Sequence, residues 1–510
     1  MVGDRTAGRF CAVKQGYLIR VRAVFMRSGE SREEAEEPSE AEVRANVVAR
    51  KQGNACGAKE RRKVESVSDK RTENKSAGVP PPVAKQAEEI HGRWPWVERS
   101  VWSERMLRAL ENGVKGDRWF SLIDKAWKTD NLWASWLGVT LNQGGAGVDG
   151  QTLAEYNRNV QAGIDQLQRE LQKGIYQPKP VKRVWIPKPG SQDKRPLGIP
   201  AVRDRIVQGA IRNVIEPIFE REFAEHSYGF RPGRGCKDAL RRVDGLLHQA
   251  KSWVVDVDFK SYFDTIPHNP LMERVQERIA DGRLLVLIES YLKAGVLERL
   301  KDWEPTEQGT PQGAVISPLL ANLYLNPLDH LMARQGYAMT RYADDFVVQC
   351  GTEAEAQAAL AQIKQWALEN GLTVHPGKTR IVNAQEEGFD FLGYRFERGR
   401  KTPRKKSMDK FKDTIRSRTR RTQGQGIGAV IIAINPTLKG WFEYFKHSNQ
   451  RVFPGLDSWI RTRLRNILRR QQHKKGWADG SDYQLWPNRF FENLGLFSLK
   501  KARALATQPR

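Results

Sequence analysis

Acidic residues on two strand-like segments place the tightest constraint on how this chain can fold. In "VVDVDFKSYFD", Asp256 and Asp258 alternate with valines, so both point to one face of a strand. In "RYADDFVVQC", Asp344 and Asp345 stand side by side at the start of an apolar run that is typical of a β-hairpin. Adjacent carboxylates repel each other, and burying them is costly unless a cation or hydrogen bonds compensate. The fold must therefore bring positive charge to these strands.

Two interpretations of these residues are open. In the first, they are polar turn residues and strand aspartates paired with arginines, since Asp is common in turns. In the second, carboxylates from separate strands form a hard, oxygen-rich site suited to Mg²⁺. Two such ions about 4 Å apart would clamp the attacking and leaving oxygens of an in-line phosphoryl transfer. The recurrence of these residues with the motifs described below favours the second interpretation.

The charge of the chain indicates a polyanionic partner. Its 510 residues include 85 Lys and Arg against 60 Asp and Glu, which gives a net charge of +25 and a pI near 9.9. Nucleic acid is expected before a membrane surface, because no segment is long enough to span a bilayer. The four cysteines are scattered and form no CxxC pair, which fits a reducing compartment. We therefore expect a soluble, intracellular, basic protein.

Helical and strand-like patterns mix along most of the chain. Residues 1–90 are rich in charge and poor in aromatic residues, which predicts a disordered extension. From about residue 135 to about residue 400, amphipathic helices and short apolar runs follow one another without regular βαβ alternation. This pattern predicts the α+β fold class.

Two loops have the composition of nucleotide-handling segments. "IPKPGSQDKRPLGIP" places Lys188 and Arg195 on a turn between two short strands, where cations could grip a triphosphate. A solvated basic turn is the alternative. "GTPQGAVISP" combines Gly309 and Gly313, which allow close backbone approach to a ligand, with the hydrogen-bonding side chain of Gln312.

The order of these motifs resembles that of the reverse transcriptases encoded by group II introns. The series is RPLGIP, VDFKSYFD, TPQGAVISPLLANLYL, YADD, HPGKTR and FDFLGYRF. "NQGGAGVDG" resembles the extra amino-terminal motif of that group, and "NPTLKGWFEYFK" resembles the start of its maturase or thumb region. The resemblance covers roughly residues 94–505, and six motifs in this order make it specific.

The resemblance implies a role for each aspartate. Asp258, Asp344 and Asp345 would be the catalytic residues and would hold two Mg²⁺ ions, with Mn²⁺ as a substitute. Asp256 and Asp264 would be structural. If these roles hold, the carboxylate pair is tolerated because metal binds to it.

The resemblance also implies a nucleotide-binding set. Lys188 and Arg195 would contact the incoming triphosphate, and Gln312 would lie beside the templating pair. Phe263 matches the aromatic gate that excludes a ribose 2′-OH by steric contact. Lys378 matches the lysine proposed to protonate pyrophosphate, although a plain surface lysine is an alternative.

A right-hand polymerase of fingers, palm and thumb is the architecture that follows from the resemblance. We expect a disordered extension at 1–90, a helical segment with a Gly-rich loop at 91–160, fingers at 161–250 and the palm at 251–400. A helical thumb or maturase domain is expected at 401–475 and a basic tail at 476–510. Members of this group that have a DNA endonuclease carry Cys and His metal ligands in an added domain. Because no Cys follows Cys350, we expect no such domain here and a primer supplied from elsewhere.

The implied function is an RNA-directed DNA polymerase that also binds its group II intron RNA, assists splicing and copies the intron into DNA. Its partners would be that RNA, an RNA template, a DNA target or primer and dNTPs, with no membrane, and a homodimer is left open. A host-adopted enzyme for DNA repair or phage defence is one alternative. A splicing-only maturase is another, although the intact aspartates and flanking motifs argue against a decayed polymerase site.

Overall fold

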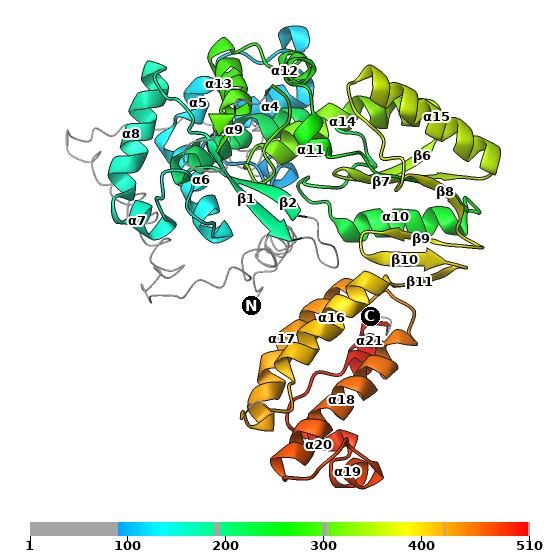
Figure 1. Ribbon diagram of the computed structural model, residues 1–510. Coiled ribbons are helices and arrows are strands. Elements are labelled where there is room, and N and C mark those ends of the chain that lie inside the picture. The colour runs from blue at the N-terminus through cyan, green and yellow to red at the C-terminus, as the bar shows by residue number, and fades with distance from the viewer. Residues whose placement is uncertain (1–89, 188–193, 298–302, 305–306, 423, 508–510) are drawn as a thin grey trace, which may run out of the picture.

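The computed structural model describes residues 90–187, 194–297, 303–304, 307–422 and 424–507. The extension expected at residues 1–90 lies outside the described residues except for its last position, and Lys188 lies outside them too. Within the described ranges, no helix is both long enough and apolar enough to cross a bilayer. A mixed body of helices and sheets and a separate group of helices near the carboxyl end make up the molecule (Figure 1). The predicted α+β class is confirmed.

The amino-terminal helices pack around α9 (Val202–Glu220). Nearly every side chain of α9 is buried, as its apolar residues on all sides require. The helices before it are α4 (Glu104–Asn112), η1 (Lys115–Asp117), α5 (Ile123–Ala126), α6 (Thr129–Asn142), α7 (Leu153–Arg158) and α8 (Val160–Lys173). The fingers sheet follows the order β2-β1-β4-β5. Its strands are β1 (Val181–Pro187), β2 (Lys194–Ile199), β4 (Val296–Leu297) and β5 (Trp303–Glu304). The predicted pairing of β1 and β2 is confirmed as antiparallel.

The palm sheet follows the order β6-β7-β3-β8, with all three pairings antiparallel. Its strands are β3 (Trp253–Val257), β6 (Ala338–Tyr342), β7 (Asp345–Cys350) and β8 (Arg380–Asn383). Helices nearby are α10 (Cys236–His248), α11 (Tyr262–Thr265), α12 (His268–Gln276), α13 (Gly282–Lys293), α14 (Ser317–Arg334) and α15 (Glu353–Glu369). Because successive side chains point to opposite faces, Val255 and Val348 join the main core, whereas Val254 and Val347 pack in the cluster that includes α10. Both faces of the sheet are thus covered.

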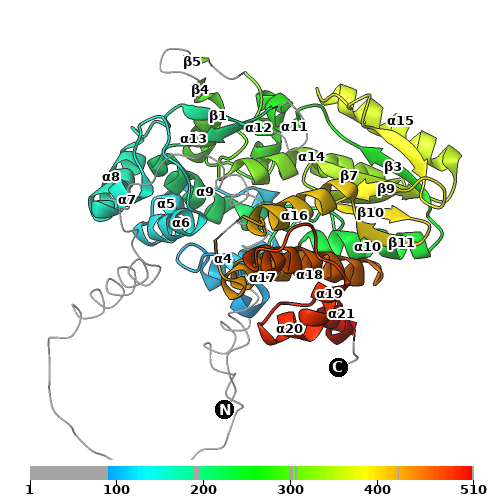
Figure 2. The same ribbon diagram turned by 60° about the horizontal axis from the view of Figure 1, so that its bottom comes forward.

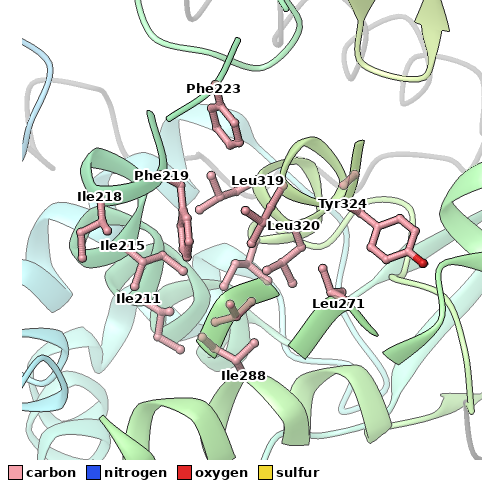
Figure 3. Close-up of a cluster of buried hydrophobic side chains, with 14 of the residues drawn as sticks. Ile211, Ile215, Ile218, Phe219, Phe223, Leu271, Ile288, Leu319, Leu320 and Tyr324 are labelled. Carbon is pink, nitrogen blue, oxygen red and sulfur yellow. The ribbon is translucent and has the colours of Figure 1, made fainter. Parts of the chain in front are cut away.

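The main core lies between the palm and the amino-terminal helices. Figure 3 shows side chains from four helices meeting there. They include Ile211, Ile215, Ile218 and Phe219 of α9, Leu271 of α12, Ile288 of α13, and Leu319, Leu320 and Tyr324 of α14. This continuous core holds α9 and α14 against the palm sheet.

The carboxyl-terminal third begins with a small sheet of order β11-β10-β9 and continues as helices. The strands are β9 (Phe389–Phe391), β10 (Tyr394–Glu397) and β11 (Arg400–Pro403). The thumb helices are α16 (Lys405–Arg418), α17 (Ile427–Phe445), α18 (Val452–Gln471), α19 (Gly480–Leu485), α20 (Asn488–Asn493) and α21 (Leu499–Thr507). In Figure 2, α16, α17 and α18 come forward as a bundle. The small sheet and the bundle are joined where the Tyr394 hydroxyl donates to the carbonyl of Tyr444 at 2.6 Å.

The last helices differ from the basic tail expected at residues 476–510. Trp486, Phe491 and Leu499 are buried in the same cluster as the α17 and α18 side chains. The segment is no richer in charge than the whole chain and holds several aromatic and aliphatic residues. These residues become visible as core residues only when α18 supplies the surface against which they pack. These helices belong physically with the thumb.

A buried carboxyl group joins α9 to the approach of β1. Asp204 is 1% exposed, and it accepts hydrogen bonds from the Tyr176 hydroxyl at 2.5 Å and from the Lys179 amide at 3.1 Å. The Tyr176 hydroxyl also lies 2.6 Å from that of Tyr291 on α13. Burial raises the pKa of Asp204 to about 6, because it outweighs the hydrogen bonds and the nearby charge of Arg203.

We predict that Asp204 makes stability fall as pH rises through the interval from its ordinary pKa of 3.8 to about 6. A carboxyl group with a raised folded-state pKa binds more protons in the native state, so its contribution is lost on deprotonation. Asp204→Asn lacks this titration. The unfolding free energy of the wild type should therefore drop relative to that of the variant by about 2–3 kcal/mol between about pH 4 and about pH 7. Urea unfolding across this range measures it, and a pH-independent difference would contradict the prediction.

Candidate functional site

Three of the sequence-predicted carboxylates come together at one end of the palm sheet. Strand β3 ends at Val257, with Asp258 directly after it, and β7 begins at Asp345. The last paired residues are Val257 and Phe346, so the antiparallel register places Asp258 opposite Asp345. Asp344 lies in the turn that joins β6 to β7. All three residues are half-buried, which leaves their carboxylates accessible to a ligand.

The turn between β6 and β7 has a constrained backbone. Ala343 has φ +61°, a left-handed conformation that is uncommon for a residue with a side chain. The backbone of Gly229 packs against it so closely that a Cβ on Gly229 would lie 2.3 Å from the Ala343 nitrogen. Beneath the turn, burial raises the pKa of Tyr262, and the charge of Asp344 adds to that effect. The carboxylate pair is therefore presented by a rigidly packed turn.

The HPGKT segment wraps around Asp258. The Lys378 ammonium lies 2.6 Å from Asp258 Oδ2, and the His375 amide donates to the Asp258 carbonyl at 2.7 Å. The Thr379 hydroxyl accepts from the Asp258 amide at 3.3 Å. No sequence signal marked Thr379 as a partner of Asp258, although Thr379 stands next to Lys378 in the motif. Lys378 contacts a carboxylate here, which distinguishes it from an unpaired surface lysine.

The donor set fits a hard divalent cation, although it is not assembled around one. In the described part of the chain, no group of three or more His, Cys, Asp or Glu side chains is arranged to hold a metal ion. The positive charge beside Asp258 is instead the ammonium of Lys378, which takes the place of a metal ion at this carboxylate. The three aspartates stand at adjoining strand ends, and carboxylate oxygens are the ligands that such ions prefer. Asp258, Asp344 and Asp345 are the residues that could hold the metal.

The fingers hairpin contacts the TPQG loop through backbone atoms. The Gly198 amide of β2 donates to the Gln312 carbonyl at 2.6 Å. A Cβ on Gly313, whose φ is +116°, would lie 2.4 Å from the Gly198 carbonyl oxygen. Gln312 itself is half-buried at this junction, and Arg195 is exposed on β2. The loop therefore uses Gly313 for close approach to the backbone of the hairpin, and its approach to a ligand stays a prediction.

Phe263 and the two remaining aspartates lie around the carboxylates. Phe263 is half-buried in α11, and its carbonyl accepts from the Thr310 amide at 2.7 Å. Burial raises the pKa of Asp264, and the charges of Arg183 and Arg195 oppose that rise. Arg195 is thus near Asp264.

Asp256 is held by a cation of its own sheet. The Arg380 guanidinium Nε lies 3.6 Å from Asp256 Oδ2. Burial raises the pKa of Asp256 to about 6, against the opposing effect of Arg380. This ion pair joins β3 to β8, and it agrees with the structural role expected for Asp256.

The comparisons with known proteins match two adjoining parts of the chain. Residues 186–396 match the family model described as "Reverse transcriptase (RNA-dependent DNA polymerase)", and residues 408–484 match "Group II intron, maturase-specific domain". Protein YkfC of Escherichia coli (strain K12) is 37% identical over 305 residues, which cover 51% of this chain and 79% of YkfC. The group II intron-encoded protein LtrA of Lactococcus lactis subsp. cremoris is 42% identical over 166 residues, and the match spans 32% of this chain and 27% of LtrA.

A solved structure titled as a partial Cas6-RT-Cas1–Cas2 complex is similar over 49% of this chain and 41% of that chain, with 25% identity and a TM-score of 0.32. At this TM-score the likeness adds nothing to the assignment. The matched reverse transcriptase region contains β2, the end of β1 and the whole palm sheet, and thus Asp258, Asp344 and Asp345.

We predict that Gly313→Ala destabilises the junction between the fingers hairpin and the TPQG loop. The added Cβ would meet the Gly198 carbonyl oxygen at 2.4 Å, and φ +116° is strained for alanine. The free energy of unfolding should fall by about 2–3 kcal/mol in urea titration. Gly440→Ala is the matched control, because a Cβ there has no neighbour within 4 Å and the residue is in α17. The control should be neutral or stabilising by up to about 1 kcal/mol. Equal effects of the two changes would refute the prediction.

Proposed function

The chain belongs to the group II intron-encoded reverse transcriptases, a class of RNA-directed DNA polymerases with a maturase domain, and we propose that its palm copies RNA into DNA using dNTPs and two Mg²⁺ ions, with Mn²⁺ as a substitute. The observation that carries this proposal is the antiparallel register of β3 and β7, which places Asp258 opposite Asp345, with Asp344 next to it. That arrangement supports a nucleotidyl transfer site and has no role in a protein that only binds RNA.

The proposed mechanism assigns the carboxylates of Asp258, Asp344 and Asp345 to holding the ions. When bound, the ions would supply charge stabilisation for the attacking 3′-oxygen and the leaving pyrophosphate. Lys378, whose ammonium lies 2.6 Å from Asp258 Oδ2, would hold a proton beside these carboxylates and would donate it to the leaving pyrophosphate.

The remaining residues of the set would bind and orient the nucleotide. Arg195, with Lys188 of the undescribed turn, would neutralise the triphosphate from the fingers hairpin. Gln312 would lie beside the templating pair, supported by the bond from the Gly198 amide to its carbonyl. The Phe263 ring would lie under the sugar and leave no room for a 2′-OH.

The thumb is proposed to bind the intron RNA and to assist its splicing. Arg416 of α16 and Arg463 of α18 both lie over the Trp459 ring, at 5.9 Å and 5.6 Å from its centroid. Arg421 lies 4.8 Å over the exposed Trp477 ring. Arginines held beside aromatic rings can contact phosphates while the rings stack on unpaired bases. We keep the division into segments at 90, 160, 250, 400 and 475 as part of the proposal, with the last helices counted with the thumb.

Cellular roles follow from the same proposal. Copying the intron into DNA during mobility requires a DNA target or primer, and the protein would work in the bacterial cytoplasm at the nucleoid. A homodimer is compatible with the proposal but is not required by it. Service in DNA repair or phage defence would use the same palm chemistry without intron RNA.

Asp344→Asn should abolish DNA synthesis while leaving RNA binding intact. The substitution removes one of three anionic ligands, so we expect kcat to fall on the order of 10³-fold. Primer extension on an RNA template with Mg²⁺ and dNTPs measures synthesis, and filter binding measures affinity for the intron RNA.

Asp256→Asn is the matched control, since it neutralises a carboxylate of the same sheet that pairs with Arg380. It should retain extension within a few-fold, as a structural role implies. Extension by Asp344→Asn at the wild-type rate would rule out the proposed site. Loss of RNA binding together with synthesis would show that polymerase and maturase surfaces are not separable.

Phe263→Val should relax the choice between deoxyribonucleotides and ribonucleotides. A smaller side chain makes room for the 2′-OH, so the ratio of kcat/KM for dNTP to that for rNTP should fall roughly 10- to 100-fold. Single-nucleotide incorporation assays give both constants. Phe120→Val, at a ring that is 64% exposed, should leave the ratio unchanged. An unchanged ratio for Phe263→Val would exclude it as the sugar gate.

A further inference from the structure

Arg341 is a charged side chain buried completely inside the palm. It belongs to β6, three residues before Asp344, and it is 0% exposed. Burial alone would lower the pKa of its guanidinium, but the nearby carboxylates of Asp329 and Asp344 outweigh this effect and the pKa is raised. A permanently charged group at such a position requires partners on several sides.

On one side, the guanidinium is held by helix α14. Nε donates to the two carboxylate oxygens of Asp329 at 2.8 Å and 3.0 Å, and Nη2 donates to the same carboxylate. Nη1 donates to Asn322 Oδ1 at 2.9 Å. Asn322 and Asp329 are seven residues apart on α14, or about two turns, so they share one face of the helix. Helix α14 is itself anchored in the main core.

On the other side, Nη1 of Arg341 reaches the turn that carries the carboxylates. It donates to the Ala343 carbonyl oxygen at 2.9 Å. Ala343 is the residue with φ +61°, so this bond holds the turn in a conformation that it would not prefer. A single nitrogen thus joins Asn322 of the core helix to the backbone unit that precedes Asp344.

The segment 226–229 closes the same arrangement from the opposite direction. The Arg341 amide donates to the His226 carbonyl at 3.0 Å, and the Tyr228 amide donates to the Arg341 carbonyl at 2.8 Å. The amide group of Asn322 donates to the Gly229 carbonyl at 2.7 Å, and the Gly229 backbone packs against Ala343. Asn322 therefore binds both the arginine and the wall of the turn.

We propose that Arg341 is a positioning residue for nucleotidyl transfer. By linking Asp329 and Asn322 of α14 to the Ala343 carbonyl, it sets the direction in which Asp344 and Asp345 project toward Asp258. This inference rests on the proposed polymerase function, because it assigns Arg341 a role in the geometry of that site. Arg341 touches neither nucleotide nor metal, and it acts only through the turn.

The planar fork of arginine is what the role requires. The ion pair with Asp329 uses one edge of the guanidinium, and the bonds to Asn322 and Ala343 use the other nitrogen. A lysine at this position keeps the charge opposite Asp329 but is a single point donor, so it cannot hold both partners at once. Arg341→Lys therefore separates the charge from the geometry.

The decisive experiment measures Mn²⁺ affinity of the full chain by electron paramagnetic resonance, alongside primer extension and template–primer binding. Arg341→Lys should weaken Mn²⁺ binding and lower kcat roughly 10- to 100-fold, the range found when residues that orient metal ligands are changed. The Kd for template–primer should stay within about twofold of the wild type, because Arg341 is fully buried and its substitution leaves the protein surface unchanged. Arg465→Lys is the matched control. Arg465 is a 2% exposed arginine of α18 that donates to the Trp486 carbonyl and to Asn488 Oδ1, far from the turn in the chain, so the Mn²⁺ affinity of this variant should be that of the wild type.

A second variant guards against misfolding. Arg341→Met combined with Asp329→Leu removes both charges and keeps the volume, so no unpaired buried charge remains. It should show the same loss of Mn²⁺ affinity with a cooperative thermal transition. Wild-type Mn²⁺ affinity in either folded variant, or equal losses in Arg341→Lys and Arg465→Lys, would overturn the positioning role. Failure of the wild type to bind Mn²⁺ or to extend a primer would overturn the polymerase proposal and this inference with it.

Discussion

The pairing of β3 with β7 is the contact on which the site depends. Its register brings Val257 opposite Phe346, and the next residues along the two strands are Asp258 and Asp345. A slip by one residue would move the apolar side chains of one strand to the other face and would separate the acids. Core packing and acid placement are therefore one constraint, because the valines that stabilise the sheet also determine where the carboxylates meet.

Acidic residues that share one sheet require cations near them, and the structure places basic side chains beside them. Lys378 contacts Asp258 at the exposed end of the sheet, and Arg380 contacts Asp256 on its face. Arg341 is different, because it pairs with Asp329 and also binds the backbone of the turn that carries Asp344 and Asp345. Some basic residues of the chain thus pair with acids of the palm, and they are distinct from the arginines of the thumb.

Much of the fold and of the acid site could be predicted from short-range patterns. The period-two alternation around Asp256, the hairpin at Ala343 and the paired strands β1 and β2 were all visible as local sequence signals. The thumb was less visible, because Trp486 and its neighbours become core residues only against α18. Thr379 was missed for a similar reason, since its partner Asp258 lies 121 residues earlier in the chain.

By itself, the sequence determined the chemistry: which carboxylates exist, which motifs surround them, in what order, and that the partner is a polyanion. Periodicity and motif order are properties of neighbouring residues, so they can be read without a fold. Only the tertiary structure decided which cation meets which acid and which helix supports the turn that carries Asp344 and Asp345. Those contacts join Lys378 to Asp258 and Arg341 to α14 across 120 and 12 residues of chain, and they form only once the core has packed. The sequence thus names the participants, and long-range packing sets the geometry that lets them act.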